Sequence, residues 1–230
     1  MIIGITGSFG SGKTTVANIF RKYGFKVIDV DKMYHNDFYK NRLLRNKIKK
    51  EFGTLDRGKL KKIVFKDYKK LQKLNKITHP IIIKAMKKEI QKIKNSKGGY
   101  KNPLTEKTAE CNEKIPIAGK NNKNKIQKGR NSKSPEEAKI AVDAPLLFEA
   151  KIEKLFDKVI VVKCDKKTQI SRVLRKKKYS KKEIEQIIKS QLPLKEKIKM
   201  ADFVVDNHGN IMETGKQVRK IVVSMKVGLL

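Results

Sequence analysis

The stretch Gly7-Ser8-Phe9-Gly10-Ser11-Gly12-Lys13-Thr14 decides the fold of this chain. It matches the motif G-x-x-x-x-G-K-[ST] once and in full. An apolar run at residues 2–6 precedes it, and at residues 14–23 apolar residues recur at helical spacing. Strand, glycine loop and helix in this order are the context in which the motif binds phosphate. The stretch therefore predicts a phosphate-binding loop (P-loop) rather than a glycine-rich turn that happens to precede a helix.

Each part of this loop has a predicted role in holding a nucleotide together with Mg²⁺. Glycines allow a close approach to phosphate that a Cβ atom would block, so successive backbone N–H groups can surround the phosphate oxygens. The Lys13 ammonium is expected to neutralise the β and γ phosphates, and the Thr14 hydroxyl to bind Mg²⁺. The predicted phosphate-binding residues are Gly10, Ser11, Gly12, Lys13, Thr14 and Thr15.

Further strands and helices alternate along the chain. Apolar, mostly β-branched segments predict strands at residues 2–6, 25–31, 139–143, 158–163 and 203–205. Helical spacing dominates between them, and Asp165 and Ser180 are suited to cap the N-termini of two helices. Five strands alternating with helices predict an α/β fold of the P-loop kinase type, with a doubly wound, five-stranded parallel sheet.

We expect one catalytic unit over residues 1–230 that contains three special segments. Residues 32–94 are helical and rich in lysine, with a new helix starting at His79-Pro80, and are expected to form a helical substrate subdomain. Residues 95–137 hold paired glycines, scattered prolines and no sustained period, which predicts a flexible insertion. It is either inert, which we favour, or binds a partner. Residues 172–190 occupy the position of a lid.

Three aspartates stand at the ends of predicted strands, where an α/β sheet faces its ligand. Asp29 and Asp31 lie two residues apart at the end of the second strand, so their side chains should point the same way. Asp31 is the candidate base that orients the acceptor hydroxyl and accepts its proton. Asp29 either supports it near the substrate or metal, or caps the next helix. Asp143 is the candidate carboxylate that reaches Mg²⁺ through water, or it simply forms a turn.

Basic residues cluster between the fourth strand and the helix that follows Ser180. Arg172, Arg175 and Lys176 are the candidates to bring positive charge to the transferring phosphate. Lysine is abundant along the whole chain, so the position of this cluster rather than its charge supports the role. His35 and His208 have no partners that the sequence reveals, and we expect neither to be a catalyst.

A net charge of +34 dominates the composition and suggests nucleic-acid binding. The charge is spread evenly, however, because residues 95–137 carry only ten Lys and Arg against five Glu. No aromatic stacking motif or nucleic-acid module accompanies it. We therefore interpret the charge as a solvated basic surface that favours anionic substrates, and we do not expect a nucleic acid as partner.

Neither secretion nor membrane insertion is indicated. Residues 1–5 run into the P-loop without a basic leader, and no stretch approaches the roughly 18 apolar residues that span a bilayer. Cys111 and Cys164 stand far apart, with neither a disulfide framework nor the spacing of a thiolate zinc site. We expect a cytoplasmic protein that is a monomer or a weak oligomer.

The chain resembles the dephospho-CoA kinase family over residues 1–94 and 139–223. Besides the P-loop and the strand that leads to Asp31, the motifs that carry the resemblance are Leu55-Asp56-Arg57 with Leu60 and Phe65, Thr78-His79-Pro80, Asp143-Ala144-Pro145-Leu146-Leu147-Phe148-Glu149, Gln169 with Arg172, Gln191, and Ala201-Asp202-Phe203-Val204-Val205-Asp206-Asn207 with Gly209. The resemblance implies transfer of a phosphoryl group from ATP to the ribose 3′-hydroxyl of dephospho-CoA, the last step of coenzyme A biosynthesis. It also implies that Asp31 is the base, that the helical subdomain holds the substrate, and that Arg57 and His79 lie near the substrate pocket.

Two features depart from the family pattern. Lys176 stands where the family has Arg, with Arg175 one position earlier, which leaves the lid cation open because Lys cannot form the bidentate contacts of Arg. Residues 95–137 have no counterpart in the typical pattern.

Two other functions compete with this one: a P-loop kinase for another nucleoside or nucleotide, and a basic nucleic-acid-binding ATPase. The motifs after the P-loop weigh against the first, and the even spread of charge weighs against the second.

Overall fold

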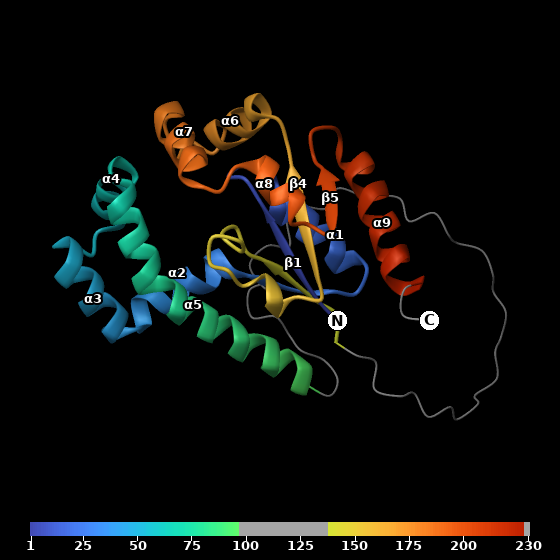
Figure 1. Cartoon of the computed structure of the whole chain (residues 1–230), viewed down its shortest axis with the longest axis horizontal. Helices are drawn as coiled ribbons and strands as arrows, with labels where there is room; N and C mark the ends of the chain where they lie inside the picture. The colour runs from blue at the N-terminus through green and yellow to red at the C-terminus, as the bar shows by residue number, and fades with distance from the viewer. Residues whose placement is uncertain (97–137, 228–230) are drawn as a thin grey trace.

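The computed structural model describes residues 1–96 and 138–227, built around one parallel sheet (Figure 1). The strands are β1 (Ile2–Gly7), β2 (Lys26–Asp29), β3 (Ile140–Asp143), β4 (Lys158–Lys163) and β5 (Phe203–Asp206). Their order across the sheet is β2-β3-β1-β4-β5, with every neighbouring pair parallel. The predicted α/β fold is confirmed. The predicted insertion at residues 95–137 lies almost wholly outside the described residues and stays a prediction.

Helices cover both faces of the sheet, as the apolar strands require. Helices α1 (Lys13–Lys22) and α9 (Ile211–Val227) pack on one face, where Phe20 and Val218 join the core. Helices α5 (Tyr68–Asn95) and α8 (Leu194–Lys199) pack on the other face. Strands of a parallel sheet are buried on both sides, which explains why the central strands carry almost no polar side chains. The doubly wound arrangement brings the carboxyl ends of the strands to one edge.

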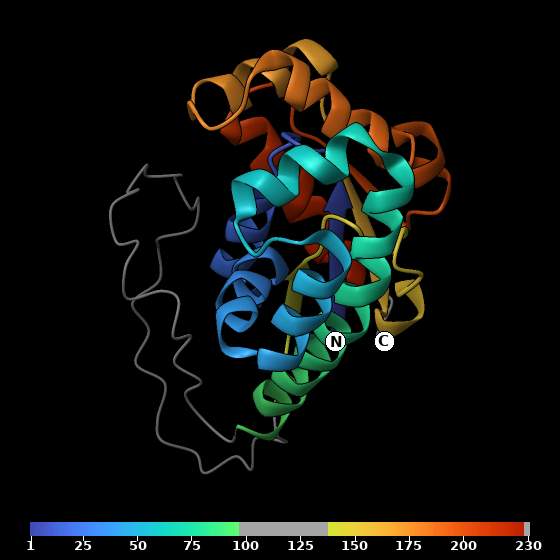
Figure 2. The same cartoon turned by 90° about the vertical axis from the view of Figure 1, so that its left-hand side faces the viewer.

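A helical group lies beside the sheet, to the left in Figure 1 and facing the viewer in Figure 2. It contains α2 (Val30–Lys40), α3 (Arg42–Phe52), α4 (Arg57–Lys66) and the first part of α5. These helices share a small core of Leu44, Ile48, Leu60 and Val64. Residues 30–96 contain no strand, in agreement with the expectation for this segment.

The remaining helices stand over the carboxyl edge of the sheet, at the top of Figure 1. They are α6 (Lys166–Leu174) and α7 (Lys181–Ser190). Elsewhere, a short 3₁₀ helix, η1 (Glu153–Leu155), precedes β4. Both predicted N-caps are present: the Asp165 side chain accepts from Thr168 N, and Ser180 forms a capping box with Glu183. No helix within residues 1–96 or 138–227 is both long and apolar enough to cross a membrane.

Two local predictions were wrong. The second strand ends at Asp29, not at residue 31, because the Asp29 side chain accepts from Lys32 N and so starts α2. No helix begins at His79-Pro80, because Pro80 lies inside the continuous helix α5. A proline in a helix interior removes one backbone hydrogen bond. Packing of α5 against α2, α3 and α4 holds the helix together despite this loss.

Candidate active site

The P-loop follows β1 and leads directly into α1. Gly10 and Gly12 adopt positive φ angles of 81° and 88°, a conformation that favours glycine. A Cβ atom on Gly12 would lie 2.0 Å from Asn207 Nδ2, and one on Gly10 would lie 2.9 Å from the carbonyl oxygen of Gln169. The glycines of the motif are therefore required both by the backbone conformation and by the close packing of the loop on α6 and the β5–α9 loop.

The Lys13 side chain is buried and folds back over the loop. Its Nζ donates to the carbonyl oxygens of Gly7 at 3.2 Å and Ser8 at 3.1 Å. Burial lowers the pKa of Lys13, while the carboxylates of Asp143 and Asp31 act in the opposite direction. Phosphate oxygens would supply the negative charge that compensates this buried ammonium.

Thr14 and Asp143 meet beside the loop. Thr14 Oγ1 donates to Asp143 Oδ2 over 2.9 Å, from the start of α1 to the end of β3. Asp143 is 4% exposed, and its Oδ1 has no hydrogen-bond partner within the described part of the chain. Burial raises the pKa of Asp143 to about 6, although Lys13 and the Thr14 hydrogen bond oppose the shift. A hydroxyl and a buried carboxylate oxygen in need of a partner fit the oxygen ligands that Mg²⁺ prefers, directly or through water.

Asp29 and Asp31 are close in sequence but differ in environment. Both oxygens of Asp29 face Lys32: Oδ1 accepts from its backbone N at 3.0 Å, and Oδ2 lies 3.5 Å from its Nζ. Asp31 lies in the first turn of α2 and lines a cavity beside the P-loop. Its side chain reaches solvent, yet crowding by protein atoms raises the pKa of its carboxyl group, and the Lys13 charge opposes this. The structure thus separates a helix-capping aspartate from one that faces the cavity.

This cavity has a volume of about 430 Å³ and lies between the P-loop, the helical group and the end of α7. Phe9, Asp31 and His79 contribute to its wall. His79 is brought there by α5, and burial lowers the pKa of its imidazole. Arg57 starts α4 and contacts the His35 ring, and its charge acts on both Asp31 and Tyr34. The helical group therefore brings predicted substrate residues toward the same cavity that Asp31 faces.

The basic residues of the expected lid lie at different depths. Arg172 is half-buried in α6, where its Nη1 donates to the carbonyl oxygen of Asn207 at 2.9 Å. Arg175 is exposed and, with Arg172 and His208, lines a second cavity of about 480 Å³ on the other side of the P-loop. Lys176 is exposed at the end of α6 and is absent from the lining of that cavity. Arg172 thus lies closest to the loop in this conformation.

The lid region also contacts the helical group and the P-loop. Lys61 Nζ of α4 lies 3.1 Å from Glu183 Oε1 of α7 and 3.6 Å from the centre of the Tyr179 ring. The Tyr179 ring packs edge-on against Phe9 of the P-loop, with 5.3 Å between the centroids. Helices α4 and α7 therefore lie side by side (Figure 2).

Sequence reasoning gave no site role to two residues that hold the P-loop in place. Asn207 Nδ2 donates to Ser11 O at 2.8 Å, and the Thr214 hydroxyl donates to Asn207 Oδ1 at 3.0 Å. On the other side, Gln191 Oε1 accepts from Phe9 N at 2.7 Å. Asn207 and Gln191 both appear in the motifs of the family resemblance, so that resemblance was the signal that could have found them.

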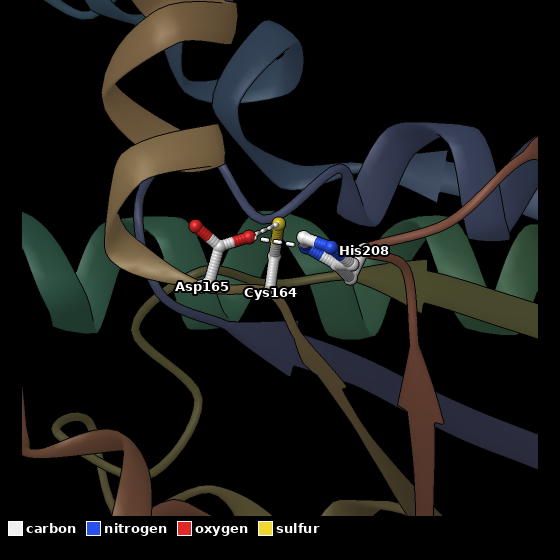
Figure 3. Close-up of side chains that lie close together, drawn as sticks. All are labelled: Cys164, Asp165 and His208. Atoms are coloured by element: carbon white, nitrogen blue, oxygen red, sulfur yellow. Dashed lines mark hydrogen bonds and ion pairs between the residues drawn. The ribbon is translucent and has the colours of Figure 1, made fainter.

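Cys164, Asp165 and His208 lie together at the carboxyl ends of β4 and β5 (Figure 3). Their ligand atoms lie within 4.8 Å of one another, a geometry that could suit a metal ion. Asp165 is already used, however, because Oδ1 accepts from Thr168 N at 2.9 Å and Oδ2 contacts the His208 ring. Burial raises the pKa of the Cys164 thiol, and Arg172 Nη1 lies 3.7 Å from its sulfur. A neutral thiol beside a guanidinium is a poor metal ligand, so we assign the group no metal: Asp165 caps α6, and Asp165 and His208 line the second cavity.

Comparison with known proteins shows the family of the chain. The family model described as dephospho-CoA kinase matches residues 1–117 and 115–213. Dephospho-CoA kinase of Aquifex aeolicus is 35% identical over 95% of this chain and 94% of its own length. The corresponding protein of Fusobacterium nucleatum is 34% identical over 96% of each chain.

Solved structures confirm the fold. A protein of Thermus thermophilus superimposes with a TM-score of 0.68 and 25% identity, over 98% of this chain and 97% of that chain. Dephospho-CoA kinase from Campylobacter jejuni superimposes with a TM-score of 0.57 and 23% identity, over 100% of this chain and 98% of that chain. Fold and site together define a P-loop kinase that acts on a small molecule. More narrowly, the chain belongs to the dephospho-CoA kinase family.

Proposed function

We propose that this protein transfers the γ-phosphoryl group of ATP to the ribose 3′-hydroxyl of dephospho-CoA, giving coenzyme A and ADP. Membership of the dephospho-CoA kinase family supports the reaction and its place as the last step of coenzyme A biosynthesis. One observation carries the mechanism: Asp31 faces a cavity beside the P-loop, near enough to Lys13 for the two charges to interact. A carboxylate in that position can hold the acceptor hydroxyl in line with the terminal phosphate.

The donor side of the reaction uses the P-loop. Backbone amides from Gly10 to Thr15 surround the phosphates, and Lys13 moves from the carbonyl oxygens of the loop to the phosphate oxygens. Thr14 and Asp143 would hold Mg²⁺, which neutralises charge on the phosphates when it is bound. The orphaned Oδ1 of Asp143 supports this role, because a bound cation or its water would satisfy it.

Asp31 acts as the base on the acceptor side. Its carboxylate accepts a hydrogen bond from the 3′-hydroxyl, orients the oxygen and takes the proton as the new bond to phosphorus forms. The raised pKa of Asp31 makes it a better proton acceptor than an ordinary aspartate. Asp29 keeps α2, and with it Asp31, in position through its cap, which is a supporting rather than a direct substrate role.

The helical segment 32–94 serves as the substrate subdomain, and residues 172–190 serve as the lid. Arg57 and His79 stand on the substrate side. Arg172 and Arg175 are the stronger lid candidates because both line the second cavity and Arg172 lies beside Gly12 of the P-loop, whereas Lys176 would need the lid to move. The second cavity, next to Arg172, is where the nucleoside part of ATP fits. We expect the enzyme to work in the cytoplasm as a monomer or weak oligomer.

A coupled assay of ADP release tests this proposal. The protein is supplied with ATP, Mg²⁺ and one acceptor at a time: dephospho-CoA, AMP, CMP or adenosine. We expect turnover with dephospho-CoA alone, and a fall in kcat of roughly 10²- to 10⁴-fold in Asp31→Asn, because the amide cannot accept the proton. Glu51→Gln is the matched control, since Glu51 forms an exposed ion pair with Lys73 on α3 and α5. Turnover with a nucleotide but not with dephospho-CoA would overturn the acceptor while leaving a P-loop kinase.

A further inference from the structure

The acceptor cavity contains a buried carboxylate that the proposed mechanism does not use. Glu149 lies in the segment that follows β3 and lines the same cavity as Asp31. Its Oε1 is well satisfied: Lys197 Nζ lies at 2.8 Å, and Leu192 N donates to it at 2.9 Å. Its Oε2 is buried and has no hydrogen-bond partner among residues 1–96 and 138–227. A buried carboxylate oxygen without a donor is costly, so this one is placed to receive a donor from a ligand.

Lys197 holds this carboxylate in place. The Lys197 side chain is fully buried, with 0% exposed, and its Nζ also donates to the carbonyl oxygen of Pro145 at 3.2 Å. The buried ammonium balances the charge of Glu149 through Oε1 and leaves Oε2 without a partner among the described residues. A charge pair that is fixed in this way presents a hydrogen-bond acceptor in a constant position.

A second orphaned group lines the same cavity. His79 Nε2 is buried and also lacks a hydrogen-bond partner in the described residues. Glu149 is near enough for its charge to act on the imidazole, although burial is the larger effect and lowers the pKa of His79. A neutral imidazole offers one donor and one acceptor nitrogen. Glu149 and His79 together therefore offer an acceptor and a donor to one ligand group.

The other walls of the cavity indicate which group this is. Phe9, Phe65, Leu146 and Ile187 give apolar and aromatic surfaces, which suit the faces of a flat ring. Adenine carries an exocyclic amino donor directly beside a ring-nitrogen acceptor. That pattern is the complement of a carboxylate beside an imidazole N–H. Asp31 is already assigned to the ribose hydroxyl, so these two groups remain for another part of the same acceptor.

We propose that Glu149 and His79 recognise the adenine base of the acceptor: Glu149 Oε2 accepts from the exocyclic amino group, and His79 Nε2 donates to N7, which remains an acceptor in hypoxanthine. Lys197 is a positioning residue for Glu149. This inference rests on the proposed function, since it assumes that dephospho-CoA occupies the cavity. It makes Glu149 and His79 determinants of acceptor specificity, separate from the chemistry at Asp31.

The test compares dephospho-CoA with its hypoxanthine analogue, in which an oxo group replaces the amino group. We expect the wild-type kcat/KM to favour dephospho-CoA by roughly ten- to hundredfold, the loss that one unpaired buried group produces. In Glu149→Gln the amide NH₂ can face the cavity and donate to the oxo group. The preference should then disappear or reverse, through KM for the acceptor rather than kcat, with KM for ATP unchanged.

Other outcomes separate the alternatives. If wild type and Glu149→Gln discriminate equally between the two bases, base recognition by Glu149 is wrong. If Glu149→Gln instead cancels the penalty of a 2′-deoxyribose analogue, Glu149 binds the ribose 2′-hydroxyl and the base assignment is overturned. A wild-type protein that does not turn over dephospho-CoA at all contradicts the proposed function and not this inference alone.

The variant His79→Leu keeps the Glu149–Lys197 pair. It tests the proposed recognition of adenine if Glu149→Gln does not fold. We expect KM for dephospho-CoA to rise about tenfold, the loss of one buried hydrogen bond, while KM for ATP stays the same. The preference for adenine over hypoxanthine should change as well. An unchanged KM and an unchanged base preference would overturn the proposal.

Discussion

Asp143 is an ionisable residue whose surroundings disfavour its charge. It is buried at the end of β3, and burial raises its pKa from 3.8 to about 6. Its neighbours are groups expected to hold phosphate and Mg²⁺. A bound Mg²⁺ would supply positive charge. A bound cation would therefore stabilise the charged form of Asp143. Without a cation, the charged carboxylate lowers the free energy of unfolding, and this effect makes the stability depend on pH.

This dependence is a testable prediction. Since the folded state binds a proton at Asp143 more tightly than the unfolded state, the associated stability is fully present below about pH 4 and is lost as the pH rises through about 6. The difference is on the order of 3 kcal/mol. Urea unfolding of the metal-free protein across this range, compared with Asp143→Asn, measures it. The Asn variant should lack this part of the pH dependence, and identical curves for the two proteins would contradict the assignment.

Asn207 acts on the P-loop from the far end of the chain. Its amide donates to Ser11 O and accepts from the Thr214 hydroxyl, and all three residues are buried. A carboxylate in its place would put negative charge beside the Ser11 carbonyl oxygen. The position of the phosphate-binding loop therefore depends on this one amide.

Asn207→Asp should raise KM for ATP by roughly tenfold and lower the free energy of unfolding by about 1–3 kcal/mol, since Ser11 O loses its donor. Thr214→Val is the milder control, because it removes the hydroxyl that contacts Asn207 Oδ1 and Asn210 O but leaves the donor to Ser11 O, and it should have a smaller effect on KM. Steady-state kinetics and urea unfolding give both quantities. A normal KM for ATP in Asn207→Asp would show that Asn207 does not position the loop.

At the scale of the elements, α5 joins the helical group to the sheet. Its first half packs in the helical group and its second half lies on the sheet, with Pro80 between them. The proline leaves the carbonyl oxygen of Lys76 without its helical N–H donor. His79, directly before the proline, is one of the residues that this helix contributes to the cavity that Asp31 lines. Helix α5 is therefore locally less stable at Pro80, next to a residue that lines the cavity.

Pro80→Ala should raise the free energy of unfolding by about 1–3 kcal/mol, because alanine restores the hydrogen bond and suits a helix interior far better. Pro193→Ala is a suitable control, since Pro193 stands at the N-cap of α8, outside a helix interior. Thermal or urea unfolding measures the difference. A loss of stability in Pro80→Ala would mean that packing around the proline ring outweighs the missing hydrogen bond.

The contact between α4 and α7 includes an ion pair of a weak kind. Lys61 and Glu183 are both partly exposed, and an ion pair of this kind holds its partners weakly. The capping box at Ser180 instead stabilises α7 itself, and the backbone hydrogen bond from Ser180 is the main reason that the pKa of Glu183 falls to about 2. A rigid helix with a weak contact to its neighbour is the arrangement that a moving lid requires.

At the scale of the whole molecule, the net charge of +34 surrounds a site for anionic substrates. ATP and dephospho-CoA both carry several negative charges, and a positive field raises the rate at which such ligands meet the protein. The same field predicts a strong response to salt, because ions screen it over about 10 Å at 0.1 M ionic strength. We therefore expect the charge to act on the rate of substrate capture rather than on nucleic-acid binding.

We expect kcat/KM for dephospho-CoA to fall by roughly tenfold between low salt and about 0.2 M salt, with kcat nearly constant, since screening affects encounter and not chemistry. The assay is the coupled ADP release described above, repeated with KCl. Added RNA should inhibit only at low salt, as expected for weak, non-specific binding. A kcat/KM that does not respond to salt would show that the basic surface has no part in substrate capture.

Features that depend on neighbours in sequence could be predicted from the sequence. The P-loop, the caps at Asp165 and Ser180, and the placement of Asp143 at a strand end all follow from side-chain chemistry and periodicity within a few residues. The alternative role of Asp29 as a helix cap followed in the same way, and the structure adopts it. These features depend on residues that are close in sequence, so the amino-acid sequence is enough to predict them.

Tertiary structure alone decided the features that join distant parts of the chain. The contact of Asn207 with Ser11, the pairing of Glu149 with Lys197, and the continuation of α5 through Pro80 all depend on packing between elements far apart in sequence. No periodicity or local motif specifies such pairs, because many partners are compatible with each residue until the sheet order and the helix positions are set. The sequence by itself determined that this is a P-loop kinase, and only the fold decided which buried groups meet around its acceptor.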